Sequence, residues 1–310
     1  MIYKLLIYKI LQLFAIMIIG FIIAKFKVVK EKDSLTLSKI SLFLLMPSAI
    51  INSFDFERSE QTSKGLVLAF ISAIAIHIVL YLLDMLFCKR IGASPVERAS
   101  IMYSNAGNLI IPIVSFVLGE EWVVYSIAFM SVQLVFIWSH GVRTFNAKEK
   151  FSIKKILLNV NIIAIAIGLL LMLFNLRLPQ FAKDITSSFG GMLGPVGMII
   201  AGILAAGIDF KAIFGNKRLY ATTITRVVIY PAIVLFAVIL PLSFLSVDNK
   251  DKILLISFLA SITPAAATIT QFAQMHNSEP EYATAINIFS TVACIVTMPL
   301  FIILFNFVIN

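Results

Sequence analysis

Long apolar segments separated by short polar ones run along almost the whole chain. Ten of them have about the 20 residues that a helix needs to cross a hydrocarbon core about 30 Å thick. Charged side chains are rare inside these segments and frequent between them. The ten segments are 5–24, 36–54, 65–87, 98–118, 122–141, 154–174, 185–207, 219–245, 252–275 and 282–306. The pattern predicts an all-α membrane protein with ten transmembrane spans, which we number one to ten.

The composition agrees with a membrane protein. Of the 310 residues, 60% are hydrophobic and only 13% are charged, about half the charged share of a soluble protein. The formal net charge is +9. Because basic residues orient membrane proteins, this charge predicts a lipid partner and requires no nucleic acid.

The distribution of Lys and Arg predicts the orientation in the plasma membrane. The loops after spans one, three, five and seven, together with the adjoining span ends, hold 17 of the 25 basic residues, whereas the loop after span nine holds none. Cytoplasmic loops are enriched in Lys and Arg, so we expect these loops inside and both termini outside the cell. The first segment has no small-residue cleavage site before a soluble domain, and we expect it to be retained.

Two of the predicted spans are interrupted by residues that suit hydrocarbon poorly. Asparagine carries amide groups that lipid cannot satisfy, and proline removes a backbone donor. The fourth span contains "NAGNLIIP" (105–112), and the ninth contains Ser261, Thr263 and Pro264 near its centre. We therefore predict a broken helix in each of these spans, the first including Asn105, Asn108 and Pro112.

The positions of the two breaks predict a repeat. Each interrupted span is the fourth of five, and Pro47 and Pro195 lie in the second span of each five. An odd number of spans per half inverts the second half relative to the first. The predicted division is a first repeat over 1–142, a cytoplasmic connection over 143–153 and an inverted second repeat over 154–310. Inverted halves with matching broken helices are typical of secondary transporters.

Broken helices predict an anion site because the first N–H groups of each half-helix are unpaired and carry partial positive charge. A small organic anion, such as a mono- or dicarboxylate, is the predicted substrate. The alternative is that these residues only cap or kink packed helices. The predicted substrate-binding residues are Asn105, Asn108, Pro112, Gln133, Ser261, Thr263 and Pro264. Gln133 lies in the middle of span five, where a plain interhelical hydrogen bond is the alternative.

Ionisable residues suggest candidates for coupling to protons. His77 lies near the centre of span three, and Glu60 and Lys64 are spaced to pair at its outer end. A structural hydrogen bond for His77 and a solvated pair for the other two are the alternatives. Arg226 lies near the inner end of span eight, where we expect it to snorkel to the interface, and attraction of anions is the alternative. Sodium coupling through backbone carbonyls at the breaks, and uniport, remain open.

Other functional classes receive less support. The sequence shows no nucleophile elbow, phosphate-binding loop or paired catalytic carboxylates, so we do not expect an enzyme. His and Cys residues show no metal-ligand spacing, and neither a metal nor an organic cofactor is expected. A membrane receptor that binds the same anion without transporting it is the remaining alternative.

Several stretches resemble the auxin efflux carrier family, which includes bacterial malate permeases and plant PIN proteins. They are "VERASIMYSNAGNLIIPIVSFVLGEE", "FIWSHG", "LLNVNIIAIAIGLLLMLFNLRLP", "GGMLGPVGMIIAGILAAGIDF" and "ITPAAATITQFAQMHNSEPEYATAINIFSTVACIVTMPLFIILF". The resemblance covers nearly the whole chain. Ile110 departs from it where many relatives have glycine, and Val160 where many have proline.

The resemblance implies an architecture and a transport mode. It implies two inverted five-span repeats with crossed broken helices at spans four and nine, similar to bile-acid symporters and sodium/proton antiporters. Spans one, two, six and seven would form a scaffold and a homodimer contact, while spans three to five and eight to ten would move as an elevator-type transport unit. Five glycines in span seven fit close helix approach: Gly190, Gly191, Gly194, Gly197 and Gly202.

Overall fold

The computed structural model describes residues 2–30, 32–55, 59–146, 152–208 and 215–309. Within these ranges every regular element is helical except one isolated β-bridge. The elements of the first half are α1 (Ile2–Lys25), α2 (Asp33–Ile40), η1 (Ser41–Leu45), α3 (Met46–Ser53), α4 (Glu60–Leu83), η2 (Asp84–Cys88), α5 (Pro95–Met102), α6 (Ala106–Leu118), η3 (Glu120–Trp122), α7 (Val123–Phe136), η4 (Ile137–Gly141) and α8 (Val142–Phe145). Those of the second half are α9 (Ile153–Leu157), α10 (Val160–Leu173), α11 (Gln180–Gly207), α13 (Lys217–Ile224), η5 (Thr225–Ile229), α14 (Tyr230–Val234), η6 (Leu235–Ile239), α15 (Leu240–Leu242), α16 (Lys250–Ile262), α17 (Ala267–Met275) and α18 (Pro280–Ile309).

The helices follow the apolar segments of the sequence. Seven continuous helical stretches in the described residues are long and apolar enough to cross a membrane. The three remaining segments each form two shorter helices, namely α5 with α6, α9 with α10, and α16 with α17. The all-α membrane class is therefore confirmed, while ten spans and inverted repeats remain predictions. Of the predicted connection at 143–153, residues 147–151 lie outside the described residues.

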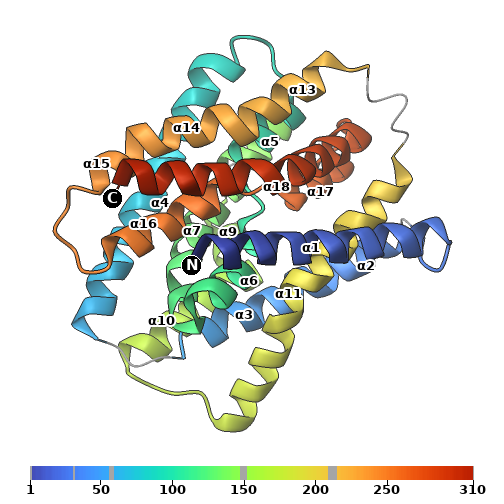
Figure 1. Cartoon of the computed structure of the whole chain (residues 1–310). Coiled ribbons are helices and arrows are strands. Elements are labelled where there is room, and N and C mark those ends of the chain that lie inside the picture. Colours follow the sequence, from blue (N-terminus) through green and yellow to red (C-terminus); the bar gives the residue numbers. More distant parts are fainter. Residues whose placement is uncertain (1, 31, 56–58, 147–151, 209–214, 310) are drawn as a thin grey trace.

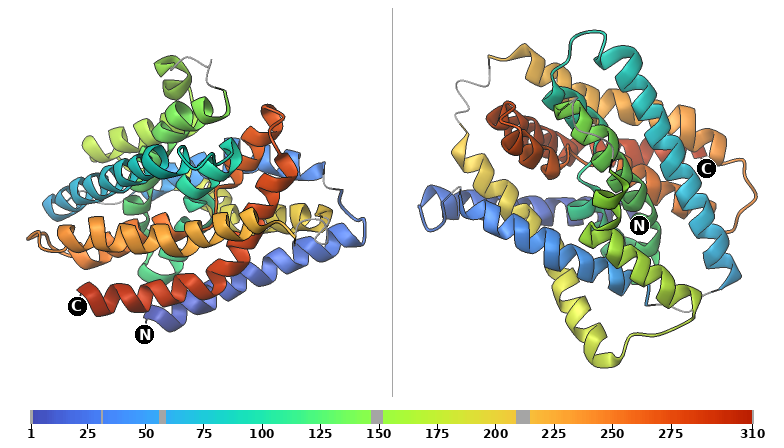
Figure 2. Two further views of the ribbon diagram at one scale, coloured as in Figure 1. Left: turned by 90° about the horizontal axis from the view of Figure 1, so that it is seen from above. Right: turned by 180° about the vertical axis from the view of Figure 1, so that it is seen from behind.

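The helices pack in two groups (Figures 1 and 2). In the first, α11 packs against α1 and α3, and α3 also contacts α10. In the second, α4, α7 and α16 pack against one another, and α18 packs against α13 and α17. The half-helix α6 contacts both groups, meeting α1 and α11 on one side and α7 and α16 on the other, and α18 also contacts α1 and α11 of the first group. The start of α1 and the end of α18 lie on the same side of the molecule.

Glycines bring α11 close to its neighbours, as the sequence predicts. A Cβ on Gly202 would overlap the backbone of α1, and one on Gly190 would lie 3.0 Å from the Cα of Ala49 in α3. A Cβ on Gly197 would lie 3.0 Å from the Cβ of Asn108 in α6. The exception is Gly191, which faces open space. Missing side chains on α11 thus allow α1, α3 and α6 to approach it closely.

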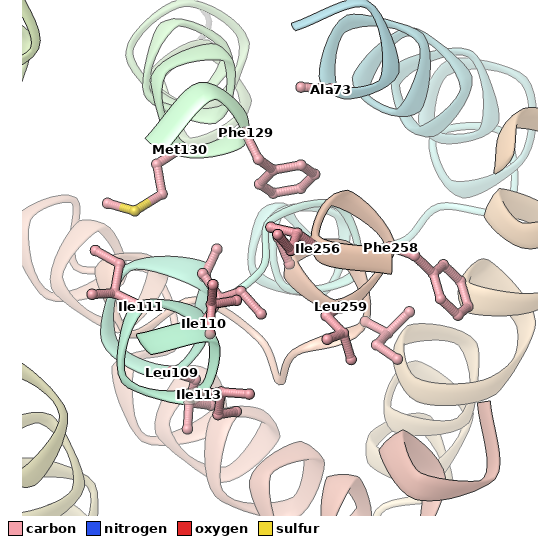
Figure 3. Close-up of a cluster of buried hydrophobic side chains, with 14 of the residues drawn as sticks. Ala73, Leu109, Ile110, Ile111, Ile113, Phe129, Met130, Ile256, Phe258 and Leu259 are labelled. Atoms are coloured by element: carbon pink, nitrogen blue, oxygen red, sulfur yellow. The ribbon is translucent and has the colours of Figure 1, made fainter. Parts of the chain in front are cut away.

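Apolar side chains fill the space between the half-helices and their neighbours (Figure 3). Ile110 of α6, Phe129 of α7 and Ile256 of α16 are each no more than 1% exposed and belong to one cluster. This cluster fixes α6 and α16 beside each other, so the two chain breaks that follow α5 and α16 meet inside the protein.

Candidate functional site

The two broken helices cross through a short piece of extended backbone. Ser104 and Ala265 form an antiparallel β-bridge. On either side of it, the Asn105 N–H donates to the Pro264 carbonyl (2.8 Å) and the Ala266 N–H donates to the Tyr103 carbonyl (3.0 Å). Each break thereby satisfies polar backbone groups of the other, which hydrocarbon could not do.

The break in the ninth segment lies where the sequence predicts it. Proline at 264 disfavours helical backbone at the preceding residue, and Thr263 is extended with φ −62° and ψ 162°. Helix α16 accordingly ends at Ile262, and α17 begins at Ala267.

The break in the fourth segment lies further toward the N-terminus than the proline suggests. Residues 103–105 are non-helical, whereas Pro112 lies inside α6. The expectation that Asn108 and Pro112 belong to the break is wrong, because both lie inside α6. The Pro112 ring instead packs against α11, where a Cβ on Gly194 would lie 2.7 Å from the Pro112 Cγ. The small facing residue thus allows α11 to approach the proline ring closely.

Each bridge residue is held at both its main-chain N–H and its carbonyl by the next long helix. Gln133 of α7 accepts from the Ser104 N–H (3.1 Å) and hydroxyl (2.6 Å) and donates to the Ser104 carbonyl (2.8 Å). On α18, the Ser290 hydroxyl accepts from the Ala265 N–H at 3.0 Å, and the Asn287 amide donates to the Ala265 carbonyl. We call these two sets of hydrogen bonds the clamps. In each half of the chain, a clamp binds both the main-chain N–H and the carbonyl of the bridge residue.

Arg226 connects the C-terminal ends of the first half-helices. Its guanidinium donates to the carbonyl of Ile101 in α5 (3.1 Å) and to those of Ser261 (2.7 Å) and Thr263 at the end of α16. The side chain is only 1% exposed. The expectation that Arg226 snorkels to the interface is wrong, because three carbonyls inside the protein bind the guanidinium.

The N-terminal ends of α6 and α17, the helices that follow the two breaks, face a cavity of about 810 Å³. Its wall includes residues of each break and of the first turn of the helix that follows it, namely Ser104, Asn105, Gly107 and Asn108 at α6, and Ala266 and Thr268 at α17. The polar lining is Ser38, Lys39, Ser104, Asn105, Asn108, Gln133, Asn159, Thr268 and Gln271. The apolar lining includes Met46, Met130, Leu134, Ile137, Trp138 and Phe272. Two helix N-termini and several amides thus meet one largely apolar space.

Asn105 leaves the start of α6 open. Although it precedes the helix, its side chain makes no capping hydrogen bond. Its Oδ1 instead accepts from the Asn108 amide at 3.2 Å, and the Oδ1 of Asn108 is buried without a partner among the described residues. The alternative that these asparagines only cap α6 is therefore not supported, and the first N–H groups of α6 remain able to bind an anion.

The other predicted residues lie elsewhere. The hydroxyls of Ser261 and Thr263 donate to Phe258 and Ala260 of their own helix (2.7 and 3.1 Å). Neither residue lines the large cavity, and Pro264 lines a separate void of about 20 Å³. The structure thus brings together Asn105, Asn108 and Gln133, but not the side chains predicted from the second break.

The candidates for proton coupling also lie outside the cavity wall. His77 is fully buried, with its Nδ1 2.7 Å from the Ala73 carbonyl and its ring 4.8 Å from that of Phe129. Glu60 and Lys64 form an ion pair at 2.7 Å, with side chains 82% and 68% exposed. The Glu60–Lys64 pair is thus exposed to solvent, in agreement with the alternative given for it.

A buried charged network, which was not among the predicted sites, attaches α5 to η2 and η4. Asp84 is bound by Arg98 through two hydrogen bonds (2.9 and 2.6 Å) and lies 3.2 Å from the Nε2 of His140. The other ring nitrogen of His140 is 2.9 Å from the hydroxyl of Tyr103 in the break. An Asp inside an apolar segment was the signal that could have identified this network.

A family comparison decides the class of this protein. The model of a family described as "Membrane transport protein", the auxin efflux carrier domain, matches the chain twice, over residues 5–155 and 145–302. The chain belongs to the auxin efflux carrier family. A search of curated proteins gave no match. Membership in this transporter family makes the cavity at the crossed breaks the first candidate for a transport site of this carrier.

Proposed function

We propose that this auxin efflux carrier family member is a secondary active transporter of a small organic anion. The substrate class is a malate-like or other carboxylate, with auxin-like acids included. The supporting observation is the 810 Å³ cavity, onto which the uncapped N-terminus of α6 and the N-terminus of α17 both open. Helix N-termini favour negative charge, and the apolar wall suits the carbon skeleton of an organic acid.

Ten spans in two inverted five-span repeats are the proposed topology. The mirrored clamps support it, because Gln133 and the pair Asn287 and Ser290 hold equivalent bridge residues from the helix after each break. An even number of crossings also agrees with α1 starting and α18 ending on one side of the molecule. We place both termini outside the plasma membrane, from the distribution of basic residues.

An elevator-type movement is the proposed mechanism. The first helix group contains α1, α3, α10 and α11, from spans one, two, six and seven, and would form the scaffold. The second group would carry the substrate, because both clamps and Arg226 belong to it. A homodimer through the scaffold helices is part of this proposal.

Protons are the proposed driving ion. His77 is the candidate inside the transport unit, since it packs against Phe129 on the same helix as Gln133. Glu60 and Lys64 would exchange protons at the outer surface, where both are exposed. Sodium-coupled symport and a receptor that binds without transport are the alternatives that the assay below separates.

Uptake by the purified protein in proteoliposomes tests the function. We expect at least one radiolabelled mono- or dicarboxylate to accumulate when the outside is acidic and sodium is absent, and we expect a protonophore to abolish this accumulation. Empty liposomes provide the control. Binding of a carboxylate without any flux would favour the receptor, and an absolute sodium requirement without a response to pH would contradict proton coupling.

A further inference from the structure

Arg226 is an isolated positive charge at the centre of the crossed helices. Its side chain is 1% exposed, and no carboxylate lies within 4.0 Å of it in the described part of the chain. Its hydrogen-bond partners are three main-chain carbonyls, and its Nε is buried without a partner there. A buried guanidinium without a carboxylate is costly, so an electrostatic compensation is required.

The compensation comes from two helix ends. Ile101 lies in the last turn of α5, and Ser261 and Thr263 lie at the end of α16. The last carbonyls of a helix are unpaired and carry partial negative charge. Arg226 therefore neutralises the C-terminal ends of both first half-helices with one rigid group.

The same carbonyls are ligands that a metal cation would use. In transporters with broken helices, unwound carbonyls and half-helix C-termini coordinate sodium. Here the guanidinium already occupies the oxygens of Ile101, Ser261 and Thr263. A second cation at this point would lose these ligands and would be repelled by a charge that does not titrate at physiological pH.

We propose that Arg226 is the built-in cation of the crossing and takes the place of a coupling sodium ion. This deepens the proposed function, on which it rests, by making anion binding independent of sodium. Ile101 and Thr263 each lie three residues before a cavity-lining residue, Ser104 and Ala266 respectively. The charge thus binds the helix ends that lead directly into the segments lining the cavity.

Thermal unfolding without substrate tests this role separately from transport. The purified protein is compared in equal concentrations of sodium chloride and choline chloride. For the native protein, and likewise for Arg226→Lys, we expect the unfolding temperature in sodium chloride to equal that in choline chloride. Arg226→Gln should unfold about 5 °C lower or more, because buried carbonyls lose a charged donor, and sodium but not choline should restore part of this loss. Lys217→Gln, at an exposed position on the same span, is the matched control and should show neither effect.

Two results would overturn the proposal. One is a sodium-specific stabilisation of the native protein, which would show that a cation site coexists with Arg226 even if Arg226→Gln does not fold. The other is a folded Arg226→Gln that sodium and choline affect equally. Both readouts are obtained without flux, so a failure to find a transported carboxylate would contradict the proposed function and leave this test intact.

Discussion

Replacement of Gln133 by leucine is expected to abolish transport and to destabilise the protein strongly. The leucine would leave the N–H and the carbonyl of Ser104 without their partners. Each buried polar group left unsatisfied costs about 1–3 kcal/mol, so the two together cost about 2–6 kcal/mol. Because these unsatisfied groups lie in the bridge where the broken helices cross, we expect the bridge between Ser104 and Ala265 to open. Thermal unfolding in detergent and uptake in proteoliposomes measure the two effects.

Gln271→Leu provides the matched control for this change. Gln271 lies on the wall of the same cavity, but its side chain makes no hydrogen bond with the described residues. We expect this variant to unfold at nearly the native temperature. If Gln133→Leu were as stable as Gln271→Leu, the clamp would not hold the break.

Asn105→Ala is expected to weaken substrate binding by about 10- to 150-fold while the protein still folds. The side chain lines the cavity beside the open N-terminus of α6, and a lost hydrogen bond to a charged group costs about 1.5–3 kcal/mol. The main-chain bond from Asn105 to Pro264 does not depend on the side chain and remains. The concentration dependence of uptake and calorimetric titration both measure this loss.

Thr263→Ala is the informative comparison. As a predicted substrate-binding residue, Thr263 should affect binding as Asn105 does. In the structure, however, its hydroxyl donates to the Ala260 carbonyl, and its own carbonyl accepts from Arg226. We therefore expect Thr263→Ala to change substrate affinity by less than about 3-fold, because it removes only a hydrogen bond within its own helix. Equal losses in both variants would place the substrate at the other ends of the half-helices.

Hydropathy predicts the helices because the length and apolarity of each segment are local properties. The ninth break is predictable for the same reason, since proline at 264 acts on its own neighbours. The position of the fourth break was not predictable from Pro112, because the bridge to the other break, at Ala265, holds the extended residues 103–105. No local signal reveals such a pairing.

The cavity was predictable in part. Asn105, Asn108 and Gln133, which attract attention as amides inside apolar segments, line the cavity, and their role in binding substrate stays a prediction. The role of Arg226 was not predictable. The sequence around an arginine is the same whether its side chain reaches the membrane interface or is buried where two helices cross, and only the tertiary structure distinguishes the two. The hydroxyls of Ser261 and Thr263 bond to their own helix, an arrangement that serine and threonine can adopt as readily as binding a ligand and that the sequence does not distinguish from it.

Protection of a cysteine in the cavity by substrate tests the central claim most directly. Gln271→Cys is introduced after alanine has replaced the two native cysteines, which are both buried. Asn249→Cys, in an exposed turn before α16, is the control. The transported carboxylate should slow labelling of Gln271→Cys by a thiol reagent and leave that of Asn249→Cys unchanged. Labelling of Gln271→Cys at the same rate with and without saturating substrate would contradict an anion site at the crossed helices.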